Sequence, residues 1–378
     1  MNSGISTSLR LFNRALLFFI LGTAAFVGCK SNQSQSVFED TYKDNGDDLE
    51  RVKQVLVAPP LLPKHEQVAS GGPKLIEVTL SAIEQKMEIA PGDSIWALTF
   101  NGSVPAPIIV VHQNDFVELT LKNPATNSMQ HNIDFHAATG EMGGGELSLV
   151  NPGQQATFRF RATKPGVFVY HCAPGGLMVP IHVTSGMNGV IMVLPRGGLQ
   201  DENGKGVKYD KAYYAVEQDY YLPKGLDGKS KNFATPQESV QGIGEALKML
   251  LPSHLVFNGK QGSLLGKNAM TANVGENVLF ISANANRDTR IHIIGGHSDL
   301  FWPGGKFNNK PLVDFETWPI PGGSAAAALY KFREPGTYVY LNHNLVEAFV
   351  LGAIAQVKVT GKWDDTYMKS IQKPAPLK

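Results

Sequence analysis

An internal repeat constrains the fold of this chain more than any other feature of its sequence. Residues 165–172 read Pro-Gly-Val-Phe-Val-Tyr-His-Cys, and residues 335–342 read Pro-Gly-Thr-Tyr-Val-Tyr-Leu-Asn. Two shorter motifs recur in the same order, Phe-Asn-Gly at 100–102 and 257–259, and a Pro-Gly pair at 152–153 and 321–322. A duplicated domain is the simplest explanation. Because Cys172 aligns with Asn342, only the first copy can hold a cysteine-bound metal.

The pattern of apolar residues predicts that both copies are β-sandwiches. Runs such as 76–80 and 116–121 alternate apolar and polar residues, which is the period of a strand with one buried face. Turns rich in Pro, Gly and Asn separate these runs, and one segment, 241–251, has the pattern of a short helix. We therefore predict an all-β chain with tandem sandwich domains at 73–198 and 199–363 and a C-terminal tail at 364–378.

The first 29 residues are predicted to be an export signal rather than part of the fold. Arg10 and Arg14 precede an apolar run at 15–27, which is too short for a comfortable membrane span. Residues 26–29, Phe-Val-Gly-Cys, resemble a bacterial lipoprotein processing site, which predicts a lipid anchor on Cys29. The alternative is a plain signal peptide with an incidental cysteine. Residues 30–72, rich in Ser, Gln, Asp, Lys and Pro, are predicted to be a flexible linker.

These features predict where the protein resides and which partners it lacks. An export signal with a lipidated cysteine predicts a periplasmic protein or an outer-membrane-anchored lipoprotein of a bacterium, which touches the membrane by its lipid only. The formal net charge of +1 offers no electrostatic reason for a nucleic-acid partner.

Cys172 is the best candidate for a metal ligand. If Cys29 carries lipid, Cys172 has no disulfide partner, and metal ligation would protect a lone thiol in an oxidising compartment. His182 and Met187 follow it in a Pro- and Gly-rich loop, and His131 lies upstream. Two imidazoles, a thiolate and a weak thioether suit an electron-transfer copper. The alternative is a buried Cys and Met in a core with an unrelated surface histidine.

Strand alternation separates the candidate ligands into two sets. Neighbouring residues of a strand face opposite sides, so His171 faces outward if Cys172 faces the inside of its sandwich. In the segment that begins at His131, Asp134 and His136 share the face opposite to that histidine. The sequence therefore predicts two metal sites joined by the peptide between His171 and Cys172, which is a short covalent route for an electron.

The second site requires a third histidine, because a catalytic metal usually has three protein ligands and an open position. The remaining histidines are His65, His112, His254, His292, His297 and His343. We favour His343, since it directly follows the repeat of the strand that carries His171. In a symmetric assembly, the second domain of one subunit could face the first domain of another. The alternative is a structural histidine at a domain edge.

Five segments of the chain resemble those of copper-containing nitrite reductases. They are residues 131–140, 168–174, 182–187, 291–297 and 342–344. The resemblance runs in order from about residue 74 to residue 363. It implies two tandem Greek-key cupredoxin domains, a homotrimer, and two copper ions per subunit, one type 1 and one type 2. One departure is Ile181, at a position that is often Trp in related enzymes and that bears on donor docking and copper colour.

The resemblance implies a role for each site residue. The type 1 copper would be bound by His131, Cys172, His182 and Met187. The type 2 copper would be bound by His136 and His171 of one subunit and by His343 of its neighbour. Asp134 and His292 match the residues that bind substrate and deliver protons, and Ile294 matches the apolar residue that crowds nitrite above the metal. The groups that orient the catalytic histidine match Glu316 and Thr317.

The implied reaction is the one-electron reduction of nitrite to nitric oxide, as in denitrification or nitrate assimilation. A small periplasmic donor, a cupredoxin or a c-type cytochrome, would reduce the type 1 copper, and the electron would pass through the His171–Cys172 link. An unperturbed Asp has a pKa near 3.9 and an unperturbed His a pKa near 6.5. We therefore expect Asp134 to hydrogen-bond nitrite directly and His292 to supply protons through water.

Other functions use the same kind of domain. A laccase-type multicopper oxidase needs repeated His-x-His pairs, and the sequence contains none. A lipid-anchored cupredoxin electron carrier without catalysis needs only one copper, and the additional ligands His136, His171 and His343 argue against it. Zinc in a three-histidine site would be inactive misloading rather than a different function.

Overall fold

The computed structural model describes residues 45–377. The predicted export signal, the lipid anchor at Cys29 and the first part of the predicted linker lie outside the described residues. Within the described range, no helix is both long and apolar enough to cross a membrane. Residues 46–377 lie in one compact unit, and the elements of this unit confirm the predicted all-β fold.

The first domain contains nine strands and three short helices. The strands are β1 (Arg51–Lys53), β2 (Leu75–Ala90), β3 (Asp93–Phe100), β4 (Ile109–His112), β5 (Phe116–Asn123), β6 (Asp134–Phe135), β7 (Gln154–Arg161), β8 (Gly166–His171) and β9 (Asn188–Leu194). The helices are η1 (Glu141–Gly144), η2 (Glu146–Ser148) and α1 (Met178–Thr184).

The second domain repeats this arrangement with longer insertions. Its strands are β10 (Lys211–Tyr220), β11 (His254–Phe257), β12 (Met270–Asn273), β13 (Asn277–Asn284), β14 (Thr289–Ile294), β15 (Ser298–Trp302), β16 (Leu312–Phe315), β17 (Thr317–Ile320), β18 (Ser324–Lys331), β19 (Gly336–Asn342) and β20 (Ile354–Thr360). Its helices are α2 (Pro236–Leu247), η3 (Gly266–Asn268), η4 (Pro303–Gly305) and α3 (Leu345–Leu351).

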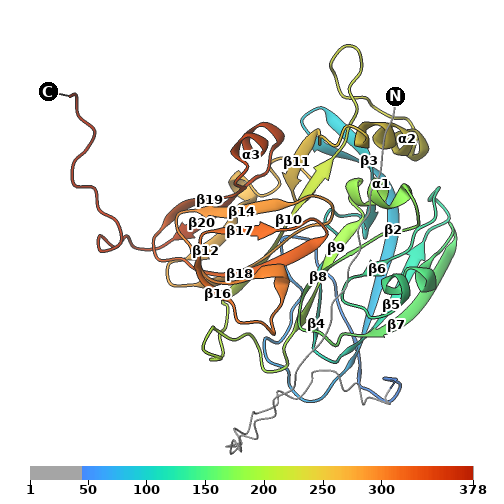
Figure 1. Cartoon of the computed structure of the whole chain (residues 1–378), viewed down its shortest axis with the longest axis horizontal. Helices are drawn as coiled ribbons and strands as arrows, with labels where there is room; N and C mark the ends of the chain where they lie inside the picture. The colour runs from blue at the N-terminus through green and yellow to red at the C-terminus, as the bar shows by residue number, and fades with distance from the viewer. Residues whose placement is uncertain (1–44, 378) are drawn as a thin grey trace, which may run out of the picture. The chain divides into compact units, whose positions relative to one another are not determined.

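The strands form four sheets, which we number in the order in which they stack. Sheet 1 has the order β1-β2-β5-β7, with β3 paired to β2, and sheet 2 has the order β4-β9-β8-β6. Sheet 3 has the order β11-β10-β13-β18-β15-β16, and sheet 4 has the order β12-β20-β19-β14-β17. Figure 1 shows β8 and β9 of the first domain beside β10 and β18 of the second. Each domain is therefore a sandwich of two sheets, as the repeat predicts.

The inner sheets, 2 and 3, are buried on both faces. Along β9, Ile191 and Val193 pack toward sheet 1, whereas Val190 and Met192 join the core between the two domains. On β13, Ile281 joins that same interdomain core, and its neighbours in sequence face sheet 4. Strands that are covered on both faces need apolar residues on both faces. This double burial fixes the side to which each residue of β8 points.

The segment before β2 differs from the predicted flexible linker. Residues 51–53 form β1, which pairs in parallel with the start of β2. The side chain of Gln54 bonds both the carbonyl and the amide of Val110, at 2.5 and 3.1 Å. The Nε2 atom of His65 lies 2.5 Å from the hydroxyl of Tyr209. Polar contacts attach this segment to the first domain and to Tyr209. Such contacts produce no hydrophobic periodicity, so the sequence pattern did not predict them.

Helix α2 is displaced from the predicted range of 241–251. It begins at Pro236 because Thr235 caps it, with the Thr235 side chain accepting from the amide of Glu238 at 3.2 Å. The carboxylate of Glu238 accepts in return from the amide of Ala234, the residue before the cap, at 3.0 Å, so the contact resembles a capping box displaced by one residue. The helix ends at Leu247, and Leu250 has a left-handed backbone with a φ of 57°. The capping residues, rather than the apolar pattern, set the start of this helix.

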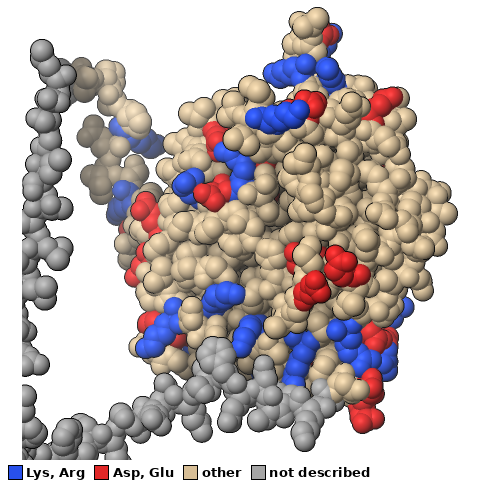
Figure 2. All heavy atoms as spheres, turned by 45° about the vertical axis from the view of Figure 1, so that its right-hand side comes forward, with Lys and Arg blue, Asp and Glu red and all other residues tan. Residues whose placement is uncertain are grey.

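Charged side chains are interspersed on the molecular surface. Figure 2 shows Lys and Arg beside Asp and Glu on the drawn face, separated by broad areas of uncharged residues. Several surface charges form ion pairs, such as Lys248 with Glu245 at 2.7 Å and Lys260 with Glu88 at 2.5 Å. Exposed pairs of this kind contribute little to stability. The apolar cores between the sheets therefore carry the fold.

Ile281→Ala tests the interdomain core. Ile281 is fully buried, and its truncation should lower the free energy of unfolding by about 2–5 kcal/mol. Urea unfolding followed by circular dichroism and tryptophan fluorescence should give one shared transition, because both domains lose the same contact. Val313→Ala, at a side chain that is 46% exposed, is the control, and it should change the free energy by less than about 0.5 kcal/mol. Separate transitions for the two probes would show that the domains unfold independently.

Candidate functional site

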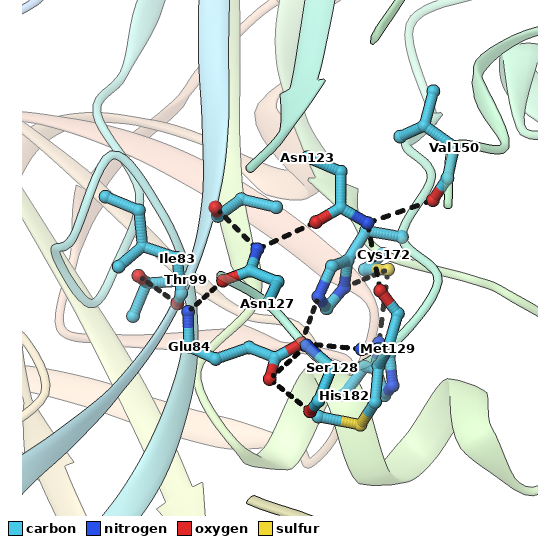
Figure 3. A network of polar contacts seen from close by, with 12 residues as sticks. Ile83, Glu84, Thr99, Asn123, Asn127, Ser128, Met129, Val150, Cys172 and His182 are labelled. Carbon is cyan, nitrogen blue, oxygen red and sulfur yellow. Dashed lines mark hydrogen bonds and ion pairs between the residues drawn. The ribbon is translucent and has the colours of Figure 1, made fainter. Parts of the chain in front are cut away.

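Cys172, His131 and His182 converge inside the first sandwich. The Cys172 Sγ atom lies 3.2 Å from His182 Nδ1 and 3.7 Å from His131 Nδ1. All three residues are fully buried, and Met187 is buried in the same core cluster as Cys172. Figure 3 shows the side chains of Cys172 and His182 beside each other. The structure thus brings the predicted first set of ligands together.

The local backbone explains how these residues meet. Strand β8 ends at His171, and the amide of Cys172 donates to the carbonyl of Met187 at 3.1 Å. Helix α1 carries His182 back toward the thiol, and the amide of Met187 donates to the His182 carbonyl at 3.0 Å. The loop after Cys172 is therefore closed by hydrogen bonds between the ligand residues themselves.

Burial sets the protonation of this cluster. It raises the pKa of the Cys172 thiol to about 12, and it lowers the pKa of His182 to about 3, with His131 lowering it further. A neutral imidazole offers a lone pair, and a metal cation favours the thiolate form of a cysteine. Two imidazole nitrogens, one sulfur and a nearby thioether are the donor set of an electron-transfer copper. The residues present therefore fit a copper ion.

Two supporting residues at this cluster were missed by the sequence analysis. Glu84 of β2 places its Oε1 atom 3.2 Å from His131 Nε2, so the other ring nitrogen faces the thiol. Asn132 donates its backbone amide to Cys172 Sγ at 3.4 Å, and its side chain bonds the amide of Ala173 at 2.7 Å. Asn132 follows a predicted ligand directly and could have been suspected. Glu84 lies on a distant strand, and nothing in the sequence links it to His131.

Glu84 is itself held by a polar network. Its carboxylate accepts from the amides of Ser128 and Met129 and from the Ser128 hydroxyl, as Figure 3 shows. Burial raises the pKa of Glu84, but the hydrogen bonds from His131, Ser128 and Met129 outweigh that effect, so the pKa is lowered. The result is a fixed, ionised carboxylate behind one histidine of the cluster.

A second group of possible metal donors lies on the outer side of the same strands. The Nε2 atoms of His136 and His171 are 3.2 Å apart, and Asp134 Oδ2 lies 3.8 Å from His171 Nε2. Asp134 pairs with His171 in the register of β6 and β8, so both leave the sheet on the same face. Burial lowers the pKa of His136, and its neighbour His171 lowers it further. Neutral imidazoles at this spacing can share one metal ion.

The backbone packs closely against this second group. Gly143 of η1 has a left-handed φ of 54°, and a Cβ atom added there would collide with Asp134 Oδ1. Only glycine allows the backbone at this position to approach the carboxylate so closely. The loop at 140–145 therefore covers one side of Asp134.

The remaining predicted site residues gather in the second domain. The rings of His292 and His343 lie 5.2 Å apart, and His292 Nδ1 lies 3.0 Å from the carbonyl oxygen of Glu316. Thr317, on β17, is the ladder partner of His292, and Ile294 ends β14, the strand of His292, with 47% of its surface exposed. The Glu316 contact is made by its backbone.

His343 does not join the second group within a single chain. The donor cluster that the described residues form there consists of Asp134, His136 and His171. The amide of His343 donates to the carbonyl of Arg290 at 2.6 Å, which holds it beside His292 instead. One chain thus presents two separate groups of candidate residues, one on each domain.

Comparison with known proteins follows the same two-domain division. Two family models, both described as multicopper oxidase, match residues 83–198 and 211–363. The copper-containing nitrite reductase of Pseudomonas chlororaphis is 56% identical over 87% of this chain and 91% of its own length. That of Alcaligenes faecalis is 56% identical over 86% of this chain and 87% of its own length.

The chain belongs to the copper-containing nitrite reductase family. The predicted resemblance is confirmed. A solved structure of a family member, the copper nitrite reductase from Nitrosomonas europaea, is 29% identical and matches with a TM-score of 0.63, covering 77% of this chain and 96% of that chain. Family membership and the donor set inside the first sandwich agree on copper as the metal.

The lowered pKa of His182 predicts how the stability of the metal-free protein depends on pH. Its pKa is about 3 in the fold, below the ordinary 6.5, so the folded state binds fewer protons than the unfolded state. The free energy of unfolding should therefore fall as pH drops below about 6.5 toward 3, by roughly 4–5 kcal/mol. Urea unfolding of metal-free protein across this range measures it.

His182→Gln should remove most of this acid sensitivity, because glutamine does not titrate. His297→Gln is the control, since His297 is exposed and should leave the slope against pH unchanged. Equal slopes in wild type and His182→Gln would assign the acid sensitivity to other groups.

Proposed function

We propose that this chain catalyses the one-electron reduction of nitrite, in which nitrite, one electron and two protons give nitric oxide and water. One observation carries the proposal. Cys172 and His171 are consecutive residues, yet they belong to two different clusters of metal donors. Their shared peptide is the shortest covalent path between those clusters, so an electron received at one can reach a reaction at the other.

Each donor set has a separate task in this proposal. His131, Cys172, His182 and Met187 form a type 1 site, and His136 and His171 form part of a type 2 site. Bound copper would exchange electrons at the first site and bind nitrite as a Lewis acid at the second. The buried type 1 residues exclude water, whereas the partly exposed second group is open to a small anion.

The type 2 site is completed by a second copy of the chain. His136 and His171 provide two imidazoles, and a catalytic metal usually needs three protein ligands. His343 lies on the other domain and is held in place by its bond to Arg290. We propose a homotrimer in which His343 of one subunit faces His136 and His171 of the next.

Asp134 and His292 bind nitrite and move its protons. His292 Nδ1 faces the Glu316 carbonyl, which can only accept, so this nitrogen carries a hydrogen and Nε2 remains for proton transfer. Asp134 lies beside His171 and can hydrogen-bond an anion there when protonated. Ile294, exposed at the end of β14, would restrict how nitrite lies in the completed site.

The cellular setting completes the proposal. A small periplasmic cupredoxin or c-type cytochrome supplies the electron, and Cys29 anchors the exported chain to a membrane by its lipid. The activity would then serve denitrification or nitrate assimilation. An electron carrier without catalysis would use only the first donor set, so the number of coppers separates the two functions.

The proposed activity predicts two coppers per chain and nitric oxide formation. Anaerobic assay with a reduced dye and a nitric oxide electrode should show turnover that scales with copper content. Asp134→Asn should retain both coppers but lose turnover by about 100-fold, the usual scale for an acid–base group. Asp227→Asn, at an exposed turn, is the matched control and should keep full activity. One copper per chain without nitric oxide would support the electron carrier instead.

Mixed assemblies test the shared site. His136→Ala and His343→Ala should each abolish turnover as pure proteins, because every site lacks one ligand. In assemblies that contain both variants, some sites combine the intact His343 of one chain with the intact His136 and His171 of the other. Co-expressed variants should therefore regain activity. Failure of the mixture to recover, although light scattering shows mixed oligomers, would place the whole site within one chain.

A further inference from the structure

Alignment of the two halves of the internal repeat shows which residues of the second domain occupy the positions of the metal donors in the first. Asn101 accepts from the amide of Ser81 at 2.7 Å, and Asn258 accepts from the amide of Val216 at 2.9 Å. This matched contact aligns β2 with β10, so Glu217 occupies the position of the residue that follows Ser81. The alignment of 165–172 with 335–342 places Asn342 at the position of Cys172.

Thr289 takes the place of a histidine ligand in the same comparison. Asp134 pairs with His171 in the first domain, and His292 pairs with Leu341 in the second. These pairings align Asp134 with His292. Three residues before each of them, His131 therefore aligns with Thr289. The second domain therefore has Thr289 and Asn342 where the first has two metal ligands, with a buried carboxylate between them.

Glu217 is the centre of a buried polar cluster. Its side chain faces the core between sheets 3 and 4 and is 1% exposed. Thr289 donates its hydroxyl to Oε2 at 2.9 Å, and Asn284 donates its amide to Oε1 at 3.3 Å. Among the described residues, the buried Asn342 Nδ2 atom makes no full hydrogen bond, and Glu217 is the acceptor that it faces.

This cluster supports His343 from two directions. Asn342 Oδ1 accepts from the amide of Asn344 at 3.0 Å, so the Asn342 side chain spans the backbone of His343. On the other side, the amide of His343 donates to the carbonyl of Arg290, which is the residue after Thr289. Glu217 therefore contacts both segments that fix the backbone of this histidine.

We propose that Glu217 is a positioning residue for His343, the histidine that completes the type 2 site; this rests on the proposed function above. Glu217 touches neither substrate nor metal. It orients the ligand through its hydrogen bond to Thr289 and through its contact with the Asn342 side chain. Residues that support metal ligands in this way typically change metal affinity by about 10–100-fold when they are replaced.

Asp219 provides a matched control on the same strand. It is buried to a similar degree, at 1% exposed, and lies two residues after Glu217, so both face the same side of β10. Its carboxylate accepts from Asn286 at 2.6 Å. Among the residues that the structure describes, the Asp219 carboxylate makes no hydrogen bond to Thr289, Asn342 or Asn344. Loss of a buried carboxylate as such is therefore separable from loss of the support for this ligand.

The experiment measures copper affinity at the second site in whole protein. Weakly bound copper is removed with a chelator, copper is titrated back, and type 2 occupancy is read by electron paramagnetic resonance, with type 1 colour as the internal measure of folding. Glu217→Leu should weaken the second copper by about 10–100-fold. Glu217→Gln, which keeps one acceptor oxygen at nearly the same volume, should recover most of this affinity. Asp219→Asn should leave it unchanged.

The outcomes separate this inference from the proposed function. If wild type binds a single copper and forms no nitric oxide, both the proposed function and the role of Glu217 are contradicted. If wild type binds two coppers and Glu217→Leu binds the second as tightly, only the inference is overturned. Should Glu217→Leu fail to fold, Thr289→Val removes one bond to the carboxylate at constant volume. It should weaken the second copper, and wild-type affinity in that variant would equally overturn the role of Glu217.

Discussion

The structure depends on the burial of sheets 2 and 3 on both faces. With sheet 1 on one side and the second domain on the other, β8 has no freedom to rotate or shift by one residue. Phe168, Tyr170 and Cys172 must face the core of the first sandwich, and Val169 must face the core between the domains. A shift by one residue would exchange the two faces and bury the wrong set. The opposed directions of Cys172 and His171 follow directly from this constraint.

Burial then determines the chemistry of each donor. The thiol of Cys172 and the ring of His182 lie in an apolar core, so both are neutral until a cation arrives. The second group lies at the edge of the sheet, where His136 is exposed and Asp134 is half-buried. One strand therefore presents a dry site and a wet site within two residues. A buried site limits solvent reorganisation when an electron is transferred, and a partly exposed site is accessible to small ions and protons.

The two domains treat the same position of their common fold differently. In the first domain that position holds a cluster of possible metal donors, with Glu84 behind one of them. In the second it holds Glu217, Thr289 and Asn342: Thr289 bonds the Glu217 carboxylate, and Asn342 bonds the amide of Asn344, the residue after His343. The first domain uses its core to assemble a set of metal donors, whereas the second uses its core to support the backbone of His343, which we propose as a ligand for a neighbouring copy. Duplication followed by this division explains why the same position has different side chains in the two domains.

The sequence by itself determined the fold class, the duplication and the two donor sets, because each rests on local patterns. Strand alternation separates His171 from Cys172, and the repeat aligns Cys172 with Asn342. Only the tertiary structure decided that residues 51–53 form a strand and that Glu84 supports His131. It also decided that Glu217 contacts the side chains of Thr289 and Asn342 near His343. Those contacts join residues far apart in the chain through single polar groups, which leave no periodic signal. The position of His343 also depends on a tertiary contact, because the hydrogen bond from its amide to the Arg290 carbonyl places it beside His292.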